Sequence, residues 1–434
     1  MSWEIALLVY GLVMAGCLLG GVLIGTVIGI VGILGITMVS GTRLWISLGD
    51  IVWNTSTSFT LVSIPLFVLM GEIILRSGVS GRFYAGVSRI FGRIPGGLAH
   101  TNILGCAVFS ALSGSTVATT MTMGTVALPE MRSRGYSDGL TLGTLTGGGC
   151  LGILIPPSIP MIVYASVTQE SVLAMFAAGI LPGIVLTVAF ACYVSFRVFF
   201  NRSLAPSGSA AVGDASLLGS LADTLPVVLL IAAVLGGMYW GLVTPTEAAG
   251  FGCAVAILIA LVYRDFSLDA LGQSLKNAVI TSCVVLFITI NAQFLSFAVV
   301  QAGIGRGISN YLTDLNLAPF VMFLAIVCLY IVLGMFIDGL SIMLLTVPVL
   351  YPALSGLGFP GVWLGVVIIV LIELGALTPP MGLNLFAVQS ISPKTPMSVI
   401  GRSSLPYAAI ILGLCFLLYA WPDLALYLPE LMHN

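Results

Sequence analysis

Charged residues are scarce in this sequence. Asp, Glu, Lys and Arg make up only 7% of its 434 residues, whereas a water-soluble domain carries about 25%. Hydrophobic residues account for 59%, so too few polar side chains remain to cover a surface that faces water. The composition therefore predicts an all-α polytopic membrane protein embedded in the lipid bilayer, with room for about a dozen spans of about 20 residues each.

Other features that are rare or missing exclude several classes of function. The sequence has two histidines and eight cysteines, and none of the cysteines is in a CxxC pair. It therefore offers no recognisable set of ligands for a transition metal. No GxxxxGKS or GxxxxGKT segment is present for ATP hydrolysis. The sequence also contains no HExxH motif and no other pairing of a nucleophile with a base that an intramembrane enzyme would need. No basic tract suggests nucleic acid. The chain is thus predicted not to be an enzyme and not to bind nucleic acid.

The chain contains two similar halves. "LGILIPPSIP" at 151–160 has a partner, "LGALTPPMGL", at 374–383, and at the same offset Ser115 aligns with Asp338. A segment rich in Ser, Ala and Gly, "NRSLAPSGSAAVGDASLLGS", separates the halves and is typical of a flexible linker. We therefore predict a first repeat at 1–200, a linker at 201–221 and a second repeat at 222–434.

The positions of the basic residues predict how the halves are oriented. None precedes Arg43, Arg197 and Arg202 flank the linker, and the tail "WPDLALYLPELMHN" contains no Lys or Arg. Because cytoplasmic loops are enriched in Lys and Arg, the linker is expected in the cytoplasm and both termini outside. The halves would then form inverted-topology repeats, an arrangement common among secondary transporters.

Each half has a segment that we predict to be a re-entrant hairpin. The first, about 94–132, has basic residues at both ends and the hydroxyl-rich "SALSGSTVATT" in its middle. The second, about 318–357, has "FIDGLS" at its tip. The alternative is a pair of ordinary helices joined by a turn. Three segments that mix apolar residues with charge or Trp are predicted to lie along the membrane interface around the hairpins, with irregular spans as the alternative: 42–59, 81–97 and 267–282.

Each hairpin is followed by a predicted broken helix, at about 139–166 and about 361–392. Three glycines and Pro156-Pro157 interrupt the first, and Gly375, Pro379-Pro380 and Gly382 interrupt the second. A helix broken within the membrane exposes carbonyls that attract a cation and amides that attract a carboxylate. If the interruptions are only kinks, no such site exists.

The hairpin tips carry oxygen ligands. Tip one offers Ser113, Ser115, Thr116 and Thr119, and tip two offers Asp338, Gly339 and Ser341. Hydroxyl, carbonyl and carboxylate oxygens suit Na⁺ far better than a transition metal. We expect each tip to meet the break of its own half, and Asp338 to be functional because it lies within the membrane.

Four further polar residues are weighed individually. Glu247 in "VTPTEAAG" has the spacing of a capping box with Thr244. Glu72 and His100 are interpreted as structural. Glu373 adjoins the second break, and the sequence favours neither a functional nor a structural role for it.

Four of these motifs resemble a known family. "LGILIPPSIPMIVYA", "LTPPMGLNLF", "VTPTEAAG" and "SGSTVATT" are similar to segments of the large permease subunit of tripartite ATP-independent periplasmic (TRAP) transporters, and the resemblance covers nearly the whole chain. It implies Na⁺-driven symport of an organic acid across the bacterial inner membrane by an elevator-type movement. It also implies two partners, a small four-helix membrane subunit and a periplasmic substrate-binding protein. The alternative is a self-sufficient Na⁺/carboxylate symporter that needs no binding protein.

The resemblance also implies site residues. The family's two cation sites correspond to Ser113 and Ser115 with Gly149 and Gly152, and to Asp338 and Gly339 with Gly375 and Thr378. We further predict that the carboxylate of the substrate lies between the tips, near Ser115, Pro157, Ser158 and Asn384.

Overall fold

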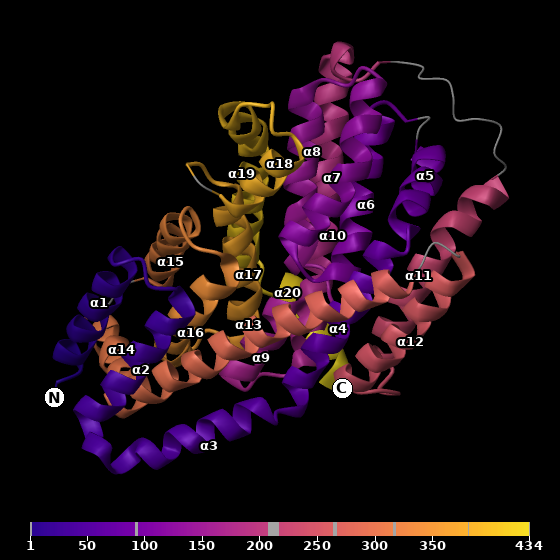
Figure 1. Ribbon diagram of the computed structural model, residues 1–434. Coiled ribbons are helices and arrows are strands. Elements are labelled where there is room, and N and C mark those ends of the chain that lie inside the picture. The colour runs from indigo at the N-terminus through magenta and orange to yellow at the C-terminus, as the bar shows by residue number, and fades with distance from the viewer. Residues whose placement is uncertain are drawn as a thin grey trace.

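The computed structural model describes residues 2–433 except 92–93, 207–216, 264–266, 316–317 and 381. Within these residues the chain is helical, and Figure 1 shows the helices gathered into one body. The first half contains α1 (Trp3–Leu19), α2 (Ile24–Ser40), η1 (Gly41–Leu44), α3 (Trp45–Ser56), α4 (Phe59–Arg76), α5 (Val79–Phe91), α6 (Gly97–Ser113), α7 (Thr116–Ser133), α8 (Asp138–Gly149), η2 (Cys150–Ile153), α9 (Ile159–Thr168) and α10 (Val172–Phe200). The remainder contains η3 (Arg202–Leu204), α11 (Leu217–Tyr239), α12 (Pro245–Tyr263), α13 (Leu268–Gln301), α14 (Ile304–Asp314), α15 (Pro319–Gly334), α16 (Gly339–Ser355), α17 (Gly361–Leu377), α18 (Leu383–Ile391), α19 (Met397–Ala420) and α20 (Asp423–His433).

Two helical hairpins are each followed by an interrupted helix. Helices α6 and α7 form the first hairpin, and α8, η2 and α9 form an interrupted helix. In the second half the same order recurs, with α15 and α16 followed by α17 and α18. The interruptions at 154–158 and 378–382 contain the two Pro-Pro pairs, which lack the N–H groups that would continue the helix.

The two interrupted helices run in opposite directions. At one end, Tyr164 near the end of α9 donates a hydrogen bond to the carbonyl of Gly361, which begins α17, over 2.7 Å. At the other end, Arg132 beside the start of α8 donates to Ser392 and Thr395, just after α18, over 2.9 and 3.0 Å. Each interrupted helix therefore begins beside the end of the other.

These elements form the centre of the molecule. Nearly every residue of α17 and α8 is buried, and so is most of α6. Such helices, apolar on all sides and covered by neighbours, are typical of the interior of a membrane protein.

The other helices pack outside this centre. Helix α13 lies along α2 and α4, and α12 lies along α4. The contact with α2 is close because glycines face α13: a Cβ atom at Gly32 would lie 2.6 Å from the backbone nitrogen of Leu295. Small residues permit this approach between helices in membranes.

Within the described residues, seven helical segments are long and apolar enough to cross a membrane, judged by length and composition. They are 24–56, 59–76, 172–200, 219–239, 245–263, 268–301 and 397–420. The hairpin and interrupted helices are shorter apolar segments. A multi-pass membrane protein follows from this pattern.

The segment 267–282, predicted to lie along the membrane interface with an irregular span as the alternative, is not a helix of its own. That segment is the first half of α13, which continues without a break to Gln301. Its polar side chains bond to a neighbouring helix: Gln273 accepts a hydrogen bond from Arg76 over 2.6 Å, and Asn277 donates to Glu72 over 3.1 Å.

The predicted linker, 201–221, falls partly outside the described residues, at 207–216. Its first part contains the short helix η3, and α11 already begins at Leu217, so the predicted end at 221 is too late. The backbone N–H of Ser137 donates to the carbonyl of Leu204 over 3.0 Å, which attaches η3 to the loop before α8.

Candidate functional site

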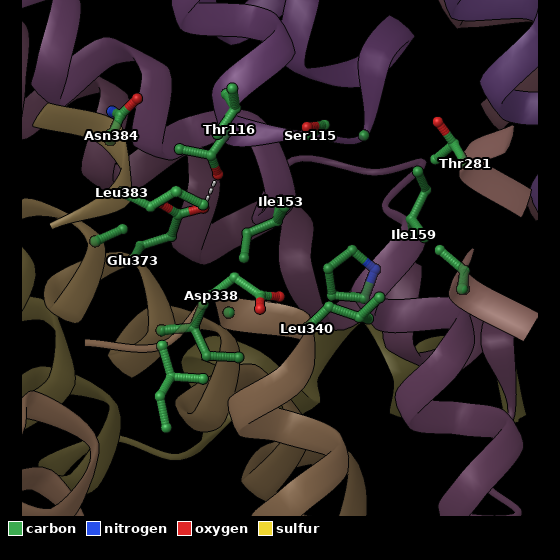
Figure 2. Close-up of a pocket in the computed structure, with 18 residues that line it drawn as sticks. Ser115, Thr116, Ile153, Ile159, Thr281, Asp338, Leu340, Glu373, Leu383 and Asn384 are labelled. Carbon is green, nitrogen blue, oxygen red and sulfur yellow. Dashed lines mark hydrogen bonds between the residues drawn. The ribbon is translucent and has the colours of Figure 1, made fainter. Parts of the chain in front are cut away.

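Both hairpin tips and both helix breaks border one cavity of about 210 Å³. Figure 2 shows side chains from these four elements, and from α13, pointing into a common space. The lining residues are Gly114, Ser115, Thr116, Val117, Ile153, Ile159, Pro160, Thr281, Val285, Ile337, Asp338, Gly339, Leu340, Ile372, Glu373, Ala376, Leu383 and Asn384.

The first tip is seated on the break of its own half. Gly114 has a left-handed backbone, with φ of 56°, and forms the turn between α6 and α7. A Cβ atom there would lie 3.1 Å from the carbonyl oxygen of Pro157. A Cβ atom on Gly152 would lie 2.6 Å from the backbone nitrogen of Thr116. Glycine is needed at both positions because the two backbones almost touch.

The second tip meets the second break in the same way. A Cβ atom at Gly334 or at Gly375 would lie 2.6 Å from the Cα atom of the other glycine. Gly339 packs directly against Ile372 of α17. Each hairpin and its broken helix therefore form one close-packed unit.

Hydrogen bonds also join the first hairpin to the second broken helix. Thr116 donates to Glu373, as the dashed line in Figure 2 indicates. One turn further along α7, Thr120 donates to the side-chain oxygen of Asn384 over 2.6 Å. Asn384 in turn donates to the carbonyl of Thr146 over 2.7 Å. This set of hydrogen bonds, called the ladder below, joins the two hairpin and broken-helix units into a single body.

The ladder was not predicted from the sequence. Its only local signal is the spacing of Thr116 and Thr120, which places both hydroxyls on one face of α7. Their partners lie 257 and 264 residues away, so no local pattern identifies them. The position of Gly149 follows from the same contact, because a Cβ atom there would collide with Thr120.

Two of the helices that begin at the cavity, α7 and α16, are capped by residues predicted for the site. Ser115 accepts a hydrogen bond from the backbone N–H of Ala118 over 3.4 Å, at the start of α7. Asp338 accepts from the N–H of Ser341 over 3.0 Å, at the start of α16. Ser158 precedes α9, is fully buried, and has a hydroxyl without a hydrogen-bond partner.

The ionisable side chains that line the cavity are acidic. Asp338 and Glu373 line it, and none of its described lining residues is Lys, Arg or His. Glu373 is only 1% exposed, and its second oxygen, Oε2, has no hydrogen-bond partner. A charged carboxylate in such a place is costly, so a cation that enters the cavity would favour the ionised form of Glu373.

The predicted site residues fall into two groups. Four line the cavity: Ser115, Asp338, Gly339 and Asn384. The others lie behind this lining, in the tips and breaks: Ser113, Gly149, Gly152, Pro157, Ser158, Gly375 and Thr378. Among these, the hydroxyl of Ser113 is paired with that of Thr119 at 2.6 Å, and the Thr378 hydroxyl donates to the carbonyl of Leu374 over 2.6 Å.

Three polar residues interpreted as structural have partners inside the protein. Glu72 pairs with Arg76 at 3.2 Å. The backbone N–H of Thr244 donates to Glu247 over 2.8 Å, and that of Glu247 donates to the Thr244 hydroxyl over 3.3 Å, which forms the predicted capping box. The ring of His100 contacts the hydroxyl of Ser195 at 3.3 Å.

Comparison with known proteins identifies relatives over nearly the full chain. The family model described as "Tripartite ATP-independent periplasmic transporter, DctM component" matches residues 11–424. The C4-dicarboxylate TRAP transporter large permease protein DctM of Pseudomonas aeruginosa is 33% identical over 387 residues, which cover 88% of this chain and 89% of that protein. The sialic acid TRAP transporter large permease protein SiaM of Vibrio cholerae is 30% identical over 428 residues, which cover 94% and 99%.

Two further comparisons agree with these. The 2,3-diketo-L-gulonate TRAP transporter large permease protein YiaN of Escherichia coli is 30% identical over 425 residues, covering 95% of this chain and 97% of that protein. Among solved structures, the YdaH transporter of Alcanivorax borkumensis has a similar fold. Its TM-score is 0.60 at 17% sequence identity, over 88% of this chain and 89% of that chain.

Proposed function

Because this chain belongs to the DctM family of TRAP transporter large permeases, which are transport proteins and not enzymes, we propose that it imports a carboxylate-bearing organic acid together with Na⁺. It would do so in the bacterial inner membrane, with both termini on the periplasmic side. A periplasmic binding protein would deliver the cargo, and a small four-helix membrane subunit would complete the transporter.

The observation that carries this proposal is the charge of the cavity. Two acidic side chains line it, and none of the described lining residues is basic. A third carboxylate, that of the cargo, would be repelled unless cations entered first. Coupling to Na⁺ would therefore follow from electrostatics, because bound Na⁺ converts a site that repels organic acids into one that accepts them.

The surrounding groups suit these two ligands. The caps Ser115 and Asp338 and the carbonyls exposed at the breaks are hard oxygen donors for Na⁺. The amides at the starts of α9 and α18, together with Asn384, could then hold the cargo carboxylate. In this scheme Glu373 balances the positive charge of bound Na⁺ at the point where the two broken helices meet the first hairpin.

An elevator movement is part of the proposal. The hairpins and broken helices are joined by backbone contacts at glycines and by the Thr116–Glu373 and Thr120–Asn384 bonds, so they would move as one body. The cavity opens against Thr281 and Val285 of α13, a helix that packs on α2 and α4. We place the sliding boundary at α13, with the helices around it as the fixed scaffold.

Reconstituted uptake tests this function. Proteoliposomes containing this chain and its small subunit would be given a binding protein loaded with an organic acid, with and without an inward Na⁺ gradient. We expect uptake only with all components and the gradient. Uptake by this chain alone would support the self-sufficient symporter, and uptake that persists without the gradient would indicate a passive channel.

A further inference from the structure

A second cavity, of about 200 Å³, lies between α8, α10 and α19 at the end of the molecule where α8 begins. It shares no lining residue with the cavity at the hairpin tips. Its walls are formed by Gly139, Leu140, Tyr193, Arg197, Val399, Arg402, Ser403, Pro406 and Tyr407.

Two arginines give this cavity a positive charge. Arg197 donates to the hydroxyl of Tyr193 over 2.8 Å, and its guanidinium lies 5.8 Å from the centre of that ring. In the part of the chain that the structure describes, neither Arg197 nor Arg402 has a carboxylate partner. The acid at the start of α8, Asp138, pairs with Arg132 at 2.9 Å. The positive end of the α8 dipole adds to this charge.

A buried hydroxyl without a partner points into the same space. Tyr407 is 2% exposed, and its hydroxyl has no hydrogen-bond partner. A Cβ atom at Gly147 would lie 2.5 Å from Cγ of this ring, and one at Gly143 would lie 2.9 Å from Cε2. The ring therefore runs along α8 toward its start, which directs the hydroxyl at the cavity. An acceptor bound between the two arginines would satisfy it.

The cavity lies at the basic end of the molecule. The loop before α8 is bonded to η3, and Arg132 bonds the segment after α18, so the ends near Arg132, Arg202 and Lys394 lie together. By the excess of positive charge this end faces the cytoplasm. Basic pockets between membrane helices on that side are suited to the head groups of anionic lipids.

Apolar side chains next to the cavity favour a lipid over a free anion. Val399 lines it and is 38% exposed. Phe196 and Leu405, which adjoin the lining residues Arg197 and Pro406 in the sequence, are 61% and 50% exposed. An acyl chain could lie along these side chains while its phosphate contacts the arginines. We propose that this cavity binds the phosphate of an anionic phospholipid from the cytoplasmic leaflet.

Native mass spectrometry of the full chain in detergent tests this proposal. Phosphatidylglycerol and phosphatidylcholine of equal chain length would be added in turn, and we expect the first to be retained about tenfold better. Arg402→Gln and Arg197→Gln should each lower phosphatidylglycerol retention by about tenfold, since each removes a charged hydrogen-bond donor. Lys394→Gln is the control, because it removes one charge from the same end outside the cavity.

Two further measurements complete the test. Tyr407→Phe removes a hydroxyl that has no hydrogen-bond partner among the described residues, so the variant should fold normally and retain several-fold less phosphatidylglycerol. Equal retention of the two lipids, or equal loss in Lys394→Gln and Arg402→Gln, would overturn the proposal. Displacement of phosphatidylglycerol by inorganic phosphate or by succinate would also overturn it, because it would indicate a site for free anions.

Discussion

Asp338 combines two roles that one substitution can separate. Its carboxylate lines the cavity, and it also caps α16 by accepting a hydrogen bond from Ser341. Asparagine is as good a helix cap as aspartate but carries no charge. Asp338→Asn should therefore leave the fold unchanged and remove one of the two negative charges that the proposed mechanism needs.

The size of the effect follows from these contacts. Retaining the cap limits the change in unfolding free energy to a few tenths of a kcal/mol, whereas Asp338→Ala would cost about 1 kcal/mol. An interaction with a charged group contributes about 1.5–3 kcal/mol, so the Na⁺ affinity of Asp338→Asn should fall by about ten- to a hundredfold.

The assay is uptake of the delivered organic acid into proteoliposomes over a range of Na⁺ concentrations, with thermal unfolding measured on the same preparations. We expect half-maximal uptake of Asp338→Asn to require correspondingly more Na⁺ at an unchanged melting temperature. Asp338→Ala should abolish Na⁺-driven uptake and also lower the melting temperature. A wild-type Na⁺ dependence in either variant would refute the assignment of Asp338 to the cation site.

Three other substitutions test separate parts of the account. Ser115→Leu should block uptake by filling the cavity at tip one, and unaltered kinetics would count against the hairpin site. Gly375→Ala forces a Cβ atom onto the backbone of Gly334 and should destabilise the protein by about 1–3 kcal/mol in thermal unfolding; Gly11→Ala, in open space, is the matched control and should not. Glu373→Gln keeps an acceptor for Thr116 but removes a buried charge, so we expect half-maximal uptake at higher Na⁺ without loss of thermal stability; an unchanged Na⁺ requirement would show that this charge is not coupled to the cation.

The breaks and tips could be located from the sequence because their signals are local. Proline lacks an N–H group wherever it occurs, so Pro156-Pro157 and Pro379-Pro380 mark interruptions without knowledge of the neighbours. Gly147–Gly149 and Gly375, which were also predicted to interrupt the helices, instead lie within α8 and α17. The capping box at Thr244 and Glu247 was predictable for the same reason.

The features that the sequence could not reveal depend on contacts between distant segments of the chain. The role of Glu373 could not be decided from the sequence because its partner, Thr116, lies in the other half of the chain. For the segment 267–282 the sequence left an interface helix and an irregular span open, because the contacts of Gln273 and Asn277 with Arg76 and Glu72 of α4 have no local signal. A polar residue in a membrane helix can be assigned only when its partner is known.

The most direct test of the central claim is equilibrium binding of the cargo to the purified transporter. Radiolabelled organic acid would be measured against the complete complex in buffers that contain either Na⁺ or choline at equal ionic strength. We predict binding in Na⁺ and none above background in choline, because the described residues that line the cavity include two acidic side chains and no basic one. Equal binding in both buffers would contradict it.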